Sequence, residues 1–330
     1  MIEPRLQRVR ACIVAAACGV LLIGAPGSMR AQDYPTRTVR FIVPYVPGGG
    51  VDFVGRTVAQ KLSETWGYSV IVDNRPGGGT NIGSELVARA APDGYTLLIG
   101  GVPNTVNVTL YPKLSYDLIR DFAPVILLDT APNVLAVHPL VPAKSVRELI
   151  ALAKARPREL NYASGAPGST AHLAAELFTR MAGIAMVWVP YKDNGPGMMS
   201  MIAGETQVMF KDAAGVEPQM KAGRVRALAV TSAQPSPLFP GLPTVAAAGV
   251  PGYEALTIDA VLVPAKTPAA IISRLNQEIV RALNEANAKQ TLFNSGVVVV
   301  GSSPEELGIF LKSSVAKWGK VIKDSGIRVN

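Results

Sequence analysis

The chain has 330 residues, of which 48% are hydrophobic and 17% are charged, and this balance predicts one or two globular domains with a substantial core. Without residues 1–31, which hold four arginines and one glutamate, the formal net charge of +8 falls to +5 (28 − 23). This mild excess suits an anionic small ligand, and the lack of a basic run or an aromatic-basic stripe argues against nucleic acid as a partner. Both cysteines, Cys12 and Cys18, lie near the N-terminus, which excludes disulfides, thiol chemistry and Cys-ligated zinc from the rest of the chain.

Residues 1–31 are predicted to be an export signal. Three arginines precede the almost wholly apolar stretch Ala11–Ala25, and Ala31 is a small residue at which cleavage is expected. The apolar stretch is shorter than the roughly 20 residues that a membrane-spanning helix needs. An uncleaved anchor helix and a lipid-modified Cys18 are the alternatives. We therefore expect an exported protein whose leader is removed near Ala31.

The first third of the mature chain alternates strands with helices. Strands are predicted at 39–44, 69–73 and 95–99, and helices at 52–66 and from 81 to about 89. Asp52 is the expected N-cap of the first helix. This alternation implies a parallel sheet with right-handed crossovers, and the loops after its strands open at the edge where such sheets bind ligands.

An irregular crossing is expected at 101–124, and a second α/β pattern follows it. Its strands are predicted at 125–128, 133–137, 160–163, 187–189, 207–210 and 226–230, with a helix capped by Ser145 and others after 170, after 196 and near 216–221. A further strand at 256–263 precedes the helices Pro268–Ala286 and Pro304–Lys323. Few strands are predicted near the end of the chain, so these last helices have no new sheet to pack against. We therefore expect them to return and cover the first sheet. The result is two lobes joined by two crossings, with a cleft between them.

Four loops rich in Gly or Pro lead from a strand to a helix, and they are Pro47–Asp52, Arg75–Asn81, Ser164–Thr170 and Tyr191–Pro196. A bare loop ahead of a helix leaves backbone N–H groups unpaired at the positive end of the helix dipole, which favours a carboxylate or phosphate. Ordinary turn chemistry is the alternative for any single loop. Because two loops belong to each lobe, we expect all four to face one cleft.

The sequence offers little catalytic machinery. It contains no complete dinucleotide fingerprint, no phosphate-binding P-loop and no Gly-x-Ser-x-Gly elbow. His138 and His172 are far apart, so a catalytic metal is not expected, and we predict no cofactor. His172 either braces the loop before it, touches ligand or only packs. Lys192 and Lys211 could each act as a point charge for an anion or remain surface lysines.

Many short motifs along the mature chain resemble those of the periplasmic solute-binding proteins of tripartite tricarboxylate transporters, the Bug family. The matching segments are Tyr34-Pro35, Gly48-Gly49 with Asp52 and Arg56, Asn74-Arg75-Pro76-Gly77, Pro92-Asp93-Gly94-Tyr95-Thr96, Asp121–Val125, Tyr162–Ser164 with Gly168-Ser169, Val189–Lys192, Gly223–Ser232, Leu242–Thr244, Pro251–Glu254 and Trp318. No single segment is decisive, but their order along the chain is highly specific.

The resemblance implies an α/β, two-lobed type II periplasmic-binding-protein fold, each lobe a mainly parallel sheet flanked by helices. We assign 32–132 with 255–330 to lobe 1 and 133–254 to lobe 2. The implied function is that of a monomeric, non-enzymatic receptor, which traps a small organic acid, amino acid or related carboxylate by hinge closure and delivers it to the membrane permease subunits of a tripartite transporter. The implied ligand-binding residues are Val46, Pro47, Gly48, Gly49, Gly50, Val51, Asp52, Ser164, Gly165, Gly168, Ser169, Thr170, Tyr191, Lys192, Asp193 and Lys211.

Three positions depart from the family pattern. Val51 stands where a hydroxyl residue is usual, Asp193 where Gly is usual, and Lys211 where Asp is usual. Asp193 and Lys211 together suggest a zwitterion or an amide as ligand in place of citrate. Two other functions stay open, which are a secreted α/β enzyme using His172 and Asp193, and a ligand sensor for a membrane signalling partner.

Overall fold

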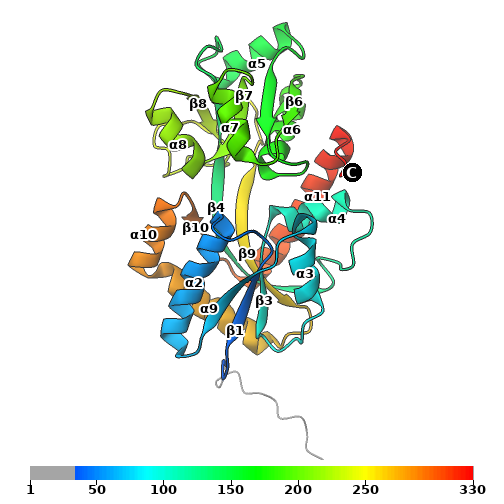
Figure 1. Ribbon diagram of the computed structural model, residues 1–330, viewed down its shortest axis with the longest axis vertical. Coiled ribbons are helices and arrows are strands. Elements are labelled where there is room, and N and C mark those ends of the chain that lie inside the picture. The colour runs from blue at the N-terminus through cyan, green and yellow to red at the C-terminus, as the bar shows by residue number, and fades with distance from the viewer. Residues whose placement is uncertain (1–33, 330) are drawn as a thin grey trace, which may run out of the picture. The chain divides into compact units, whose positions relative to one another are not determined.

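The computed structural model describes residues 34–329 (Figure 1). The alternation in the first third of the chain builds a parallel three-stranded unit, as predicted, and its strand order is β2-β1-β3. Its elements are β1 (Val39–Val43), α2 (Gly50–Trp66), β2 (Val70–Asn74), the short helix η2 (Gly78–Thr80), α3 (Asn81–Ala88) and β3 (Thr96–Gly101). Phe41 and Leu98 are fully buried, and burying one such side chain contributes about 1.5–3 kcal/mol.

A second parallel unit follows in the order β7-β5-β6. Its elements are α5 (Val146–Ala155), β5 (Asn161–Ser164), α6 (Thr170–Ala182), β6 (Val187–Pro190), α7 (Asn194–Ile202), β7 (Val208–Asp212), α8 (Ala213–Lys221) and β8 (Arg226–Val230). The predicted cap of α5 is present, because the Ser145 side chain accepts a hydrogen bond from the Glu148 backbone N–H at 3.2 Å. The second hydrogen bond of a capping box, from the Ser145 N–H to the Glu148 carboxylate, is absent, because that carboxylate accepts from the Lys144 N–H.

Two antiparallel strands, β4 (Phe122–Val137) and β9 (Leu256–Pro264), join the two parallel units. Residues 122–132 of β4 pair with β9, and residues 133–137 pair with β7 and β8. The prediction of two separate strands at 125–128 and 133–137 is therefore wrong. The polar residues between them suggested a break, but they continue the ladder that runs from one half of the fold to the other in Figure 1.

The stretch 101–124 was predicted to be an irregular crossing, and this is also wrong. Residues Val102–Leu110 form helix α4. The Asn104 side chain accepts from the Gly101 N–H at 2.9 Å, Pro103 lies in the first turn where it displaces no hydrogen bond, and Val106 and Leu110 are buried. Proline and asparagine here start a helix, whereas composition alone suggested a loop.

The C-terminal part contains α9 (Ala269–Asn284), α10 (Ala286–Asn294), β10 (Val298–Val299) and α11 (Pro304–Ser325). Helices α9 and α11 pack against β4, and α11 also packs against α4, so the terminal helices return to the first sheet as predicted. The short α10 and β10 were not predicted. Ser303 caps α11 in a capping box with Glu306, and Gly326 ends the helix in the left-handed conformation.

Residues from Pro35 onward form one compact unit, whose main hydrophobic core includes side chains from both parallel units, such as Leu98, Phe178 and Phe210. The α/β fold class is confirmed, and every antiparallel pair involves β4 or β9. The residue limits proposed for the lobes fall within β4 and just before β9, and they remain a prediction.

Candidate functional site

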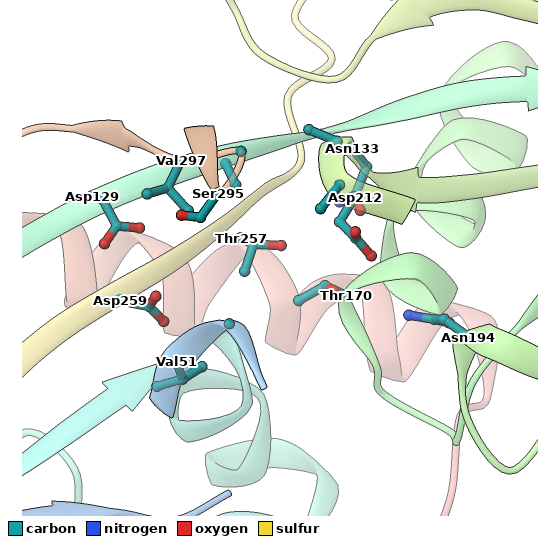
Figure 2. Close-up of a pocket in the computed structure, with 15 residues that line it drawn as sticks. Val51, Asp129, Asn133, Thr170, Asn194, Asp212, Thr257, Asp259, Ser295 and Val297 are labelled. Carbon is teal, nitrogen blue, oxygen red and sulfur yellow. The ribbon is translucent and has the colours of Figure 1, made fainter. Parts of the chain in front are cut away.

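A pocket of about 440 Å³ lies where the two parallel units meet the crossing strands (Figure 2). It draws residues from seven separate regions of the chain, which are Gly50 and Val51; Asp129, Ala131 and Asn133; Thr170; Asn194; Asp212, Ala213 and Ala214; Thr257 and Asp259; and Ser295, Gly296 and Val297. One side of it is made of helix beginnings and another of the two long strands, so we describe these two walls separately.

Four helices begin at this pocket, and their first residues line it. We call these residues the donor wall, and they are Gly50 and Val51 of α2, Thr170 of α6, Asn194 of α7, and Ala213 and Ala214 of α8. The first N–H groups of a helix lack partners within the helix, and the dipole adds partial positive charge at the same end. Four such ends around one cavity form a site suited to a carboxylate or another small anion.

The loop before α2 is held by Asp52, although not in the predicted way. The N-cap is Gly49, and Asp52 lies buried in the first turn, so its assignment as N-cap is wrong. Its carboxylate accepts from the Gly48 N–H at 2.9 Å, from Arg56 at 2.9 Å and from the Asn74 amide at 2.8 Å. Burial alone would raise the pKa of Asp52, but these hydrogen bonds lower it below its usual range. Asp52 thus fixes the loop that brings Gly50 and Val51 to the pocket.

The loop before α6 is braced by a buried aromatic stack. His172 stacks on Trp188 with ring centroids 4.0 Å apart, and its Nδ1 accepts from the Gly168 N–H at 3.2 Å. Trp188 Nε1 in turn donates to Ser164 Oγ at 2.7 Å. Burial lowers the pKa of His172 to about 4, despite the opposing charge of Glu176. Of the alternatives left open for His172, the structure therefore supports bracing of the loop, and Thr170 is the residue of this loop that lines the pocket.

The other predicted residues of the second parallel unit have partners of their own. The Tyr191 hydroxyl donates to Ser200 Oγ at 2.5 Å, and Lys192 is exposed. Asp193 caps α7 by accepting from the Gly195 N–H at 2.7 Å. Lys211 forms an ion pair with the neighbouring Asp212. None of these four predicted residues lines the pocket, whereas Asn194 and Asp212 beside them do.

The four Gly- and Pro-rich loops do not all reach this pocket. Gly50, Val51, Thr170 and Asn194 come from three of them, but Arg75–Asn81 contributes no residue to its lining. Asn107 of α4 instead donates from its amide to the Gly79 carbonyl at 2.6 Å and to Asn81 Oδ1 at 2.8 Å. The unpredicted helix α4 thus holds this loop in place.

Another part of the pocket lining is formed by side chains of the crossing strands. We call these residues the acid wall, and they are Asp129 and Asn133 of β4 with Thr257 and Asp259 of β9. An irregularity in the ladder between Leu127 and Asp129 makes Asp129 and Asp259 direct cross-strand partners. They are 1% and 3% exposed, and Figure 2 shows both carboxyl groups at the end of the pocket near Val51.

The two carboxyl groups of the acid wall titrate abnormally. Burial, and then the nearby charge of Asp259, raises the pKa of Asp129 well above its usual value. Burial raises the pKa of Asp259 to about 7. The sequence analysis missed this wall, although an acidic residue within each of two apolar strands, Val125–Asp129 and Ile258–Val263, was an available signal, because acids are rarely buried without a role.

The comparison with known families identifies the family of this chain. Residues 54–327 match the model of the tripartite tricarboxylate transporter family receptor. The chain belongs to this receptor family. It is a family of periplasmic solute-binding receptors, and it includes the Bug proteins with which the sequence motifs were compared.

Full-length relatives and solved structures agree with this placement. BugT of Bordetella pertussis is 35% identical over 309 residues, which cover 93% of this chain and 94% of BugT. The structure of Rpa4515 from R. palustris with adipate has 38% identity, a TM-score of 0.77, and covers 90% of this chain and 99% of its own. MatC from Rhodopseudomonas palustris with bound malate has 29% identity, a TM-score of 0.73, and covers 88% and 100%.

The fold of this receptor is thus the two-lobed type II periplasmic-binding-protein fold. Within residues 34–329, no group of three or more His, Cys, Asp or Glu side chains is placed to hold a metal ion. In the same part of the chain, no helix is both long enough and apolar enough to cross a bilayer. The predicted leader, residues 1–31, lies outside the described residues.

Proposed function

We propose that this chain is a periplasmic receptor that captures a small carboxylate in the pocket and delivers it, unchanged, to the membrane permease of a tripartite transporter. The observation that carries the proposal is the meeting of four helix N-termini at one cavity. Adipate and malate, named with two structural neighbours, are both small carboxylates. Cleavage of the leader near Ala31 would release the mature receptor.

In this proposal the ligand carboxylate is held mainly by main-chain N–H groups of the donor wall. Gly50, Val51 and Thr170 are the residues of the predicted site that line the pocket, and they are the ones we expect to touch ligand. Two other predicted residues support the loops that carry them: Asp52 accepts from the Gly48 N–H, and Ser164 accepts from Trp188, the ring that stacks on His172. Backbone donors need no counter-charge, so one receptor family can accommodate differently shaped acids.

Capture would involve a hinge movement of the lobe 133–254 against the lobe formed by 32–132 and 255–330. The backbone angles that change in this movement would lie near β4 and β9. Two glycines lie where the halves approach. A Cβ on Gly168 would be 2.7 Å from Leu110 of α4, and one on Gly296 would be 3.1 Å from the Cβ of Ala213. Both glycines have positive φ, so a side chain there would be strained as well as crowded. The closed arrangement would be the form that the permease recognises.

Binding measurements on the mature protein test this proposal. Isothermal titration calorimetry with malate, aspartate, adipate and 2-aminoadipate should give stoichiometric binding of at least one acid, with no product detected by mass spectrometry. Mass spectrometry of small molecules released by denaturing the purified receptor should identify a carboxylate. Turnover of the acid, or a co-purified ligand that lacks any acidic group, would contradict the proposal.

A further inference from the structure

In the proposed function a carboxylate ligand occupies the pocket, and the acid wall places two carboxyl groups at one end of that pocket. These two groups restrict which chemical groups the ligand can carry at that end. Asp129 and Asp259 are cross-strand partners, so their Cβ atoms lie about 5 Å apart. Two ionised carboxylates at that distance, both nearly inaccessible, repel each other strongly unless a proton or a cation lies between them. The pair therefore either shares a proton or meets a positive group from the pocket.

In the part of the chain that the structure describes, no positive side chain pairs with either carboxyl group. Among residues 34–329, neither Asp129 nor Asp259 takes part in an ion pair, and Asp129 Oδ2 and Asp259 Oδ1 are buried without a hydrogen-bond partner. Asn133, 2% exposed, also has an unpartnered Nδ2 among these residues and lines the same cavity. Unsatisfied buried polar groups are costly, so several of them around one pocket indicate that a ligand completes their hydrogen bonds.

The surrounding elements add no cation at this end either. Tyr45, in the loop after β1, lies near Asp259, because its hydroxyl is 3.0 Å from where a Cβ on Gly101 would be, and Gly101 is the cross-strand partner of Asp259. Burial and then the charge of Asp259 raise the pKa of its phenol. On α2, Arg56 is bound to Asp52, and on β7, Lys211 is bound to Asp212. The loop Ser295–Val297 and strand β10, which cover the other side, carry no titratable side chain.

We infer that Asp129 and Asp259 form a subsite for an ammonium group, so that the ligand of this receptor is a zwitterion, an amino-bearing carboxylic acid, and not a plain di- or tricarboxylate. The inference rests on the proposed function, because it assigns the ligand's carboxylate to the donor wall. The two walls then complement the two charges of one molecule. The sequence suggested a zwitterionic ligand on the basis of Asp193 and Lys211, but those two side chains already have partners. We now base the same suggestion on Asp129 and Asp259.

Ammonium binding at this subsite releases the shared proton. In the free receptor the pair holds a proton up to neutral pH, and the ammonium takes its place on binding. Affinity for an amino acid ligand should therefore rise between pH 5 and pH 8. Affinity for the matching plain acid should fall or stay constant, because ionising the pair adds only negative charge to the pocket.

The test compares ligands that differ only in the amino group, which are aspartate against succinate and 2-aminoadipate against adipate. Calorimetry at pH 8 should show the amino member of at least one pair binding 10-fold or more tightly, with that preference shrinking toward pH 5. Measurements in phosphate and in Tris should differ in enthalpy because a proton is released. Equal affinity within each pair at every pH would overturn the inference while leaving the proposed function intact.

Two variants give a second measurement. Asp129→Asn and Asp259→Asn keep side-chain shape but remove charge, so each should lose 10-fold or more in affinity for the amino ligand, lose the pH dependence and retain or gain affinity for the plain acid. Retained plain-acid binding also shows that the variant is folded. Asp324→Asn is the control: Asp324 is an exposed position of α11 outside the pocket lining, paired with Lys320 and Arg180, and its loss should leave both affinities unchanged.

The ligand that co-purifies with the receptor separates the two proposals. A zwitterionic acid supports both of them. A carboxylate without an amino group overturns the ammonium subsite alone. A co-purified molecule with no acidic group, or failure of all four acids to bind the ligand-free protein, overturns the proposed function and the subsite with it.

Discussion

The donor wall and the acid wall face the same pocket, but they are built from different parts of the chain. Four helix beginnings supply main-chain N–H groups on one side, whereas two strands supply buried carboxyl side chains on the other. Main-chain donors depend on backbone conformation and tolerate many side chains. The carboxyl pair depends on two residues and on their register, so a single substitution can remove it.

This difference suggests that general and specific recognition of the ligand are assigned to different walls. A helix N-terminus attracts any small anion, so in the proposed function the donor wall accounts for the carboxylate of the ligand. In the further inference the acid wall rejects some of those anions, because a second carboxylate placed against Asp129 and Asp259 would be repelled. The following experiments separate the two walls, in order of decreasing expected effect.

Filling the pocket should abolish binding regardless of which wall dominates. Ala214 is exposed at the start of α8 and lines the cavity, so Ala214→Trp would place a large ring in the ligand's space. We expect affinity to fall by about 100-fold or more, equivalent to ~3 kcal/mol. Ala151→Trp, on an exposed position of α5, is the matched control and should bind normally. Normal binding by Ala214→Trp would place the ligand elsewhere.

A negative charge on the donor wall should compete with the ligand carboxylate. Val51→Asp puts a carboxylate in the first turn of α2, and we expect binding to weaken by about 10- to 100-fold, an effect of ~1.4–3 kcal/mol. Val51→Asn has the same size without the charge and should weaken binding far less. Calorimetry at low and high salt should show the loss shrinking as salt screens the repulsion. Equal losses in both variants would indicate a steric effect only.

The acid wall should cost the ligand-free protein stability at high pH. The folded-state pKa of Asp259 is raised to about 7, so the folded protein binds more protons than the unfolded chain between pH 4 and 7, and stability falls as pH rises through this window. Asp259→Asn should raise the melting temperature at pH 8 by roughly 3–10 °C, and much less near pH 4. Differential scanning calorimetry against Asp324→Asn checks this. A lower melting temperature at pH 8 would contradict it.

The contribution of His172, which braces the loop before α6, to the stability of the fold should have the opposite pH dependence and be smaller than that of Asp259. Burial lowers the pKa of His172 to about 4, so the unfolded chain binds more protons between pH 4 and 6.5, and this residue's contribution is lost as pH falls through that window. His172→Phe keeps the stack on Trp188 but leaves the Gly168 N–H unpaired, a cost of about 1–3 kcal/mol.

His172→Asn is the comparison, because its side-chain oxygen can take over the acceptor role of Nδ1. We expect it to recover part of the stability that His172→Phe loses at pH 7, and both variants to lose the dependence between pH 4 and 6.5. Thermal melts measure both effects. A histidine-like pH dependence in either variant would assign that titration to another group.

Much of the fold could be predicted because its signals are local. The parallel strands β1, β2 and β3, and the helices α2 and α3 that follow the glycine-rich loops after β1 and β2, were predicted from apolar runs and turn residues. The assignments failed where local signals conflicted with packing. Pro103 suggested a loop but lies in the first turn of α4, and the polar stretch ending at Pro132 suggested a break but remains within β4.

The site was predicted in part, for the same reason. Gly50, Val51 and Thr170 follow strands and precede helices, so their place at the sheet edge could be expected from order alone. Asp193 and Lys211 were chosen as charges near a cleft, but a helix cap and an ion pair with Asp212 occupy them. Asp129 and Asp259 are 130 residues apart, and only the register of β4 on β9 pairs them.

The amino-acid sequence by itself determined the α/β class, the receptor family and the helix beginnings that form the donor wall. These features follow from short stretches of chain, where periodicity, caps and glycine decide the local conformation. Only the tertiary structure decided which residues oppose those helix ends. Cross-strand pairing between distant segments depends on the register of the whole ladder, and a shift of one residue would turn Asp129 away from Asp259.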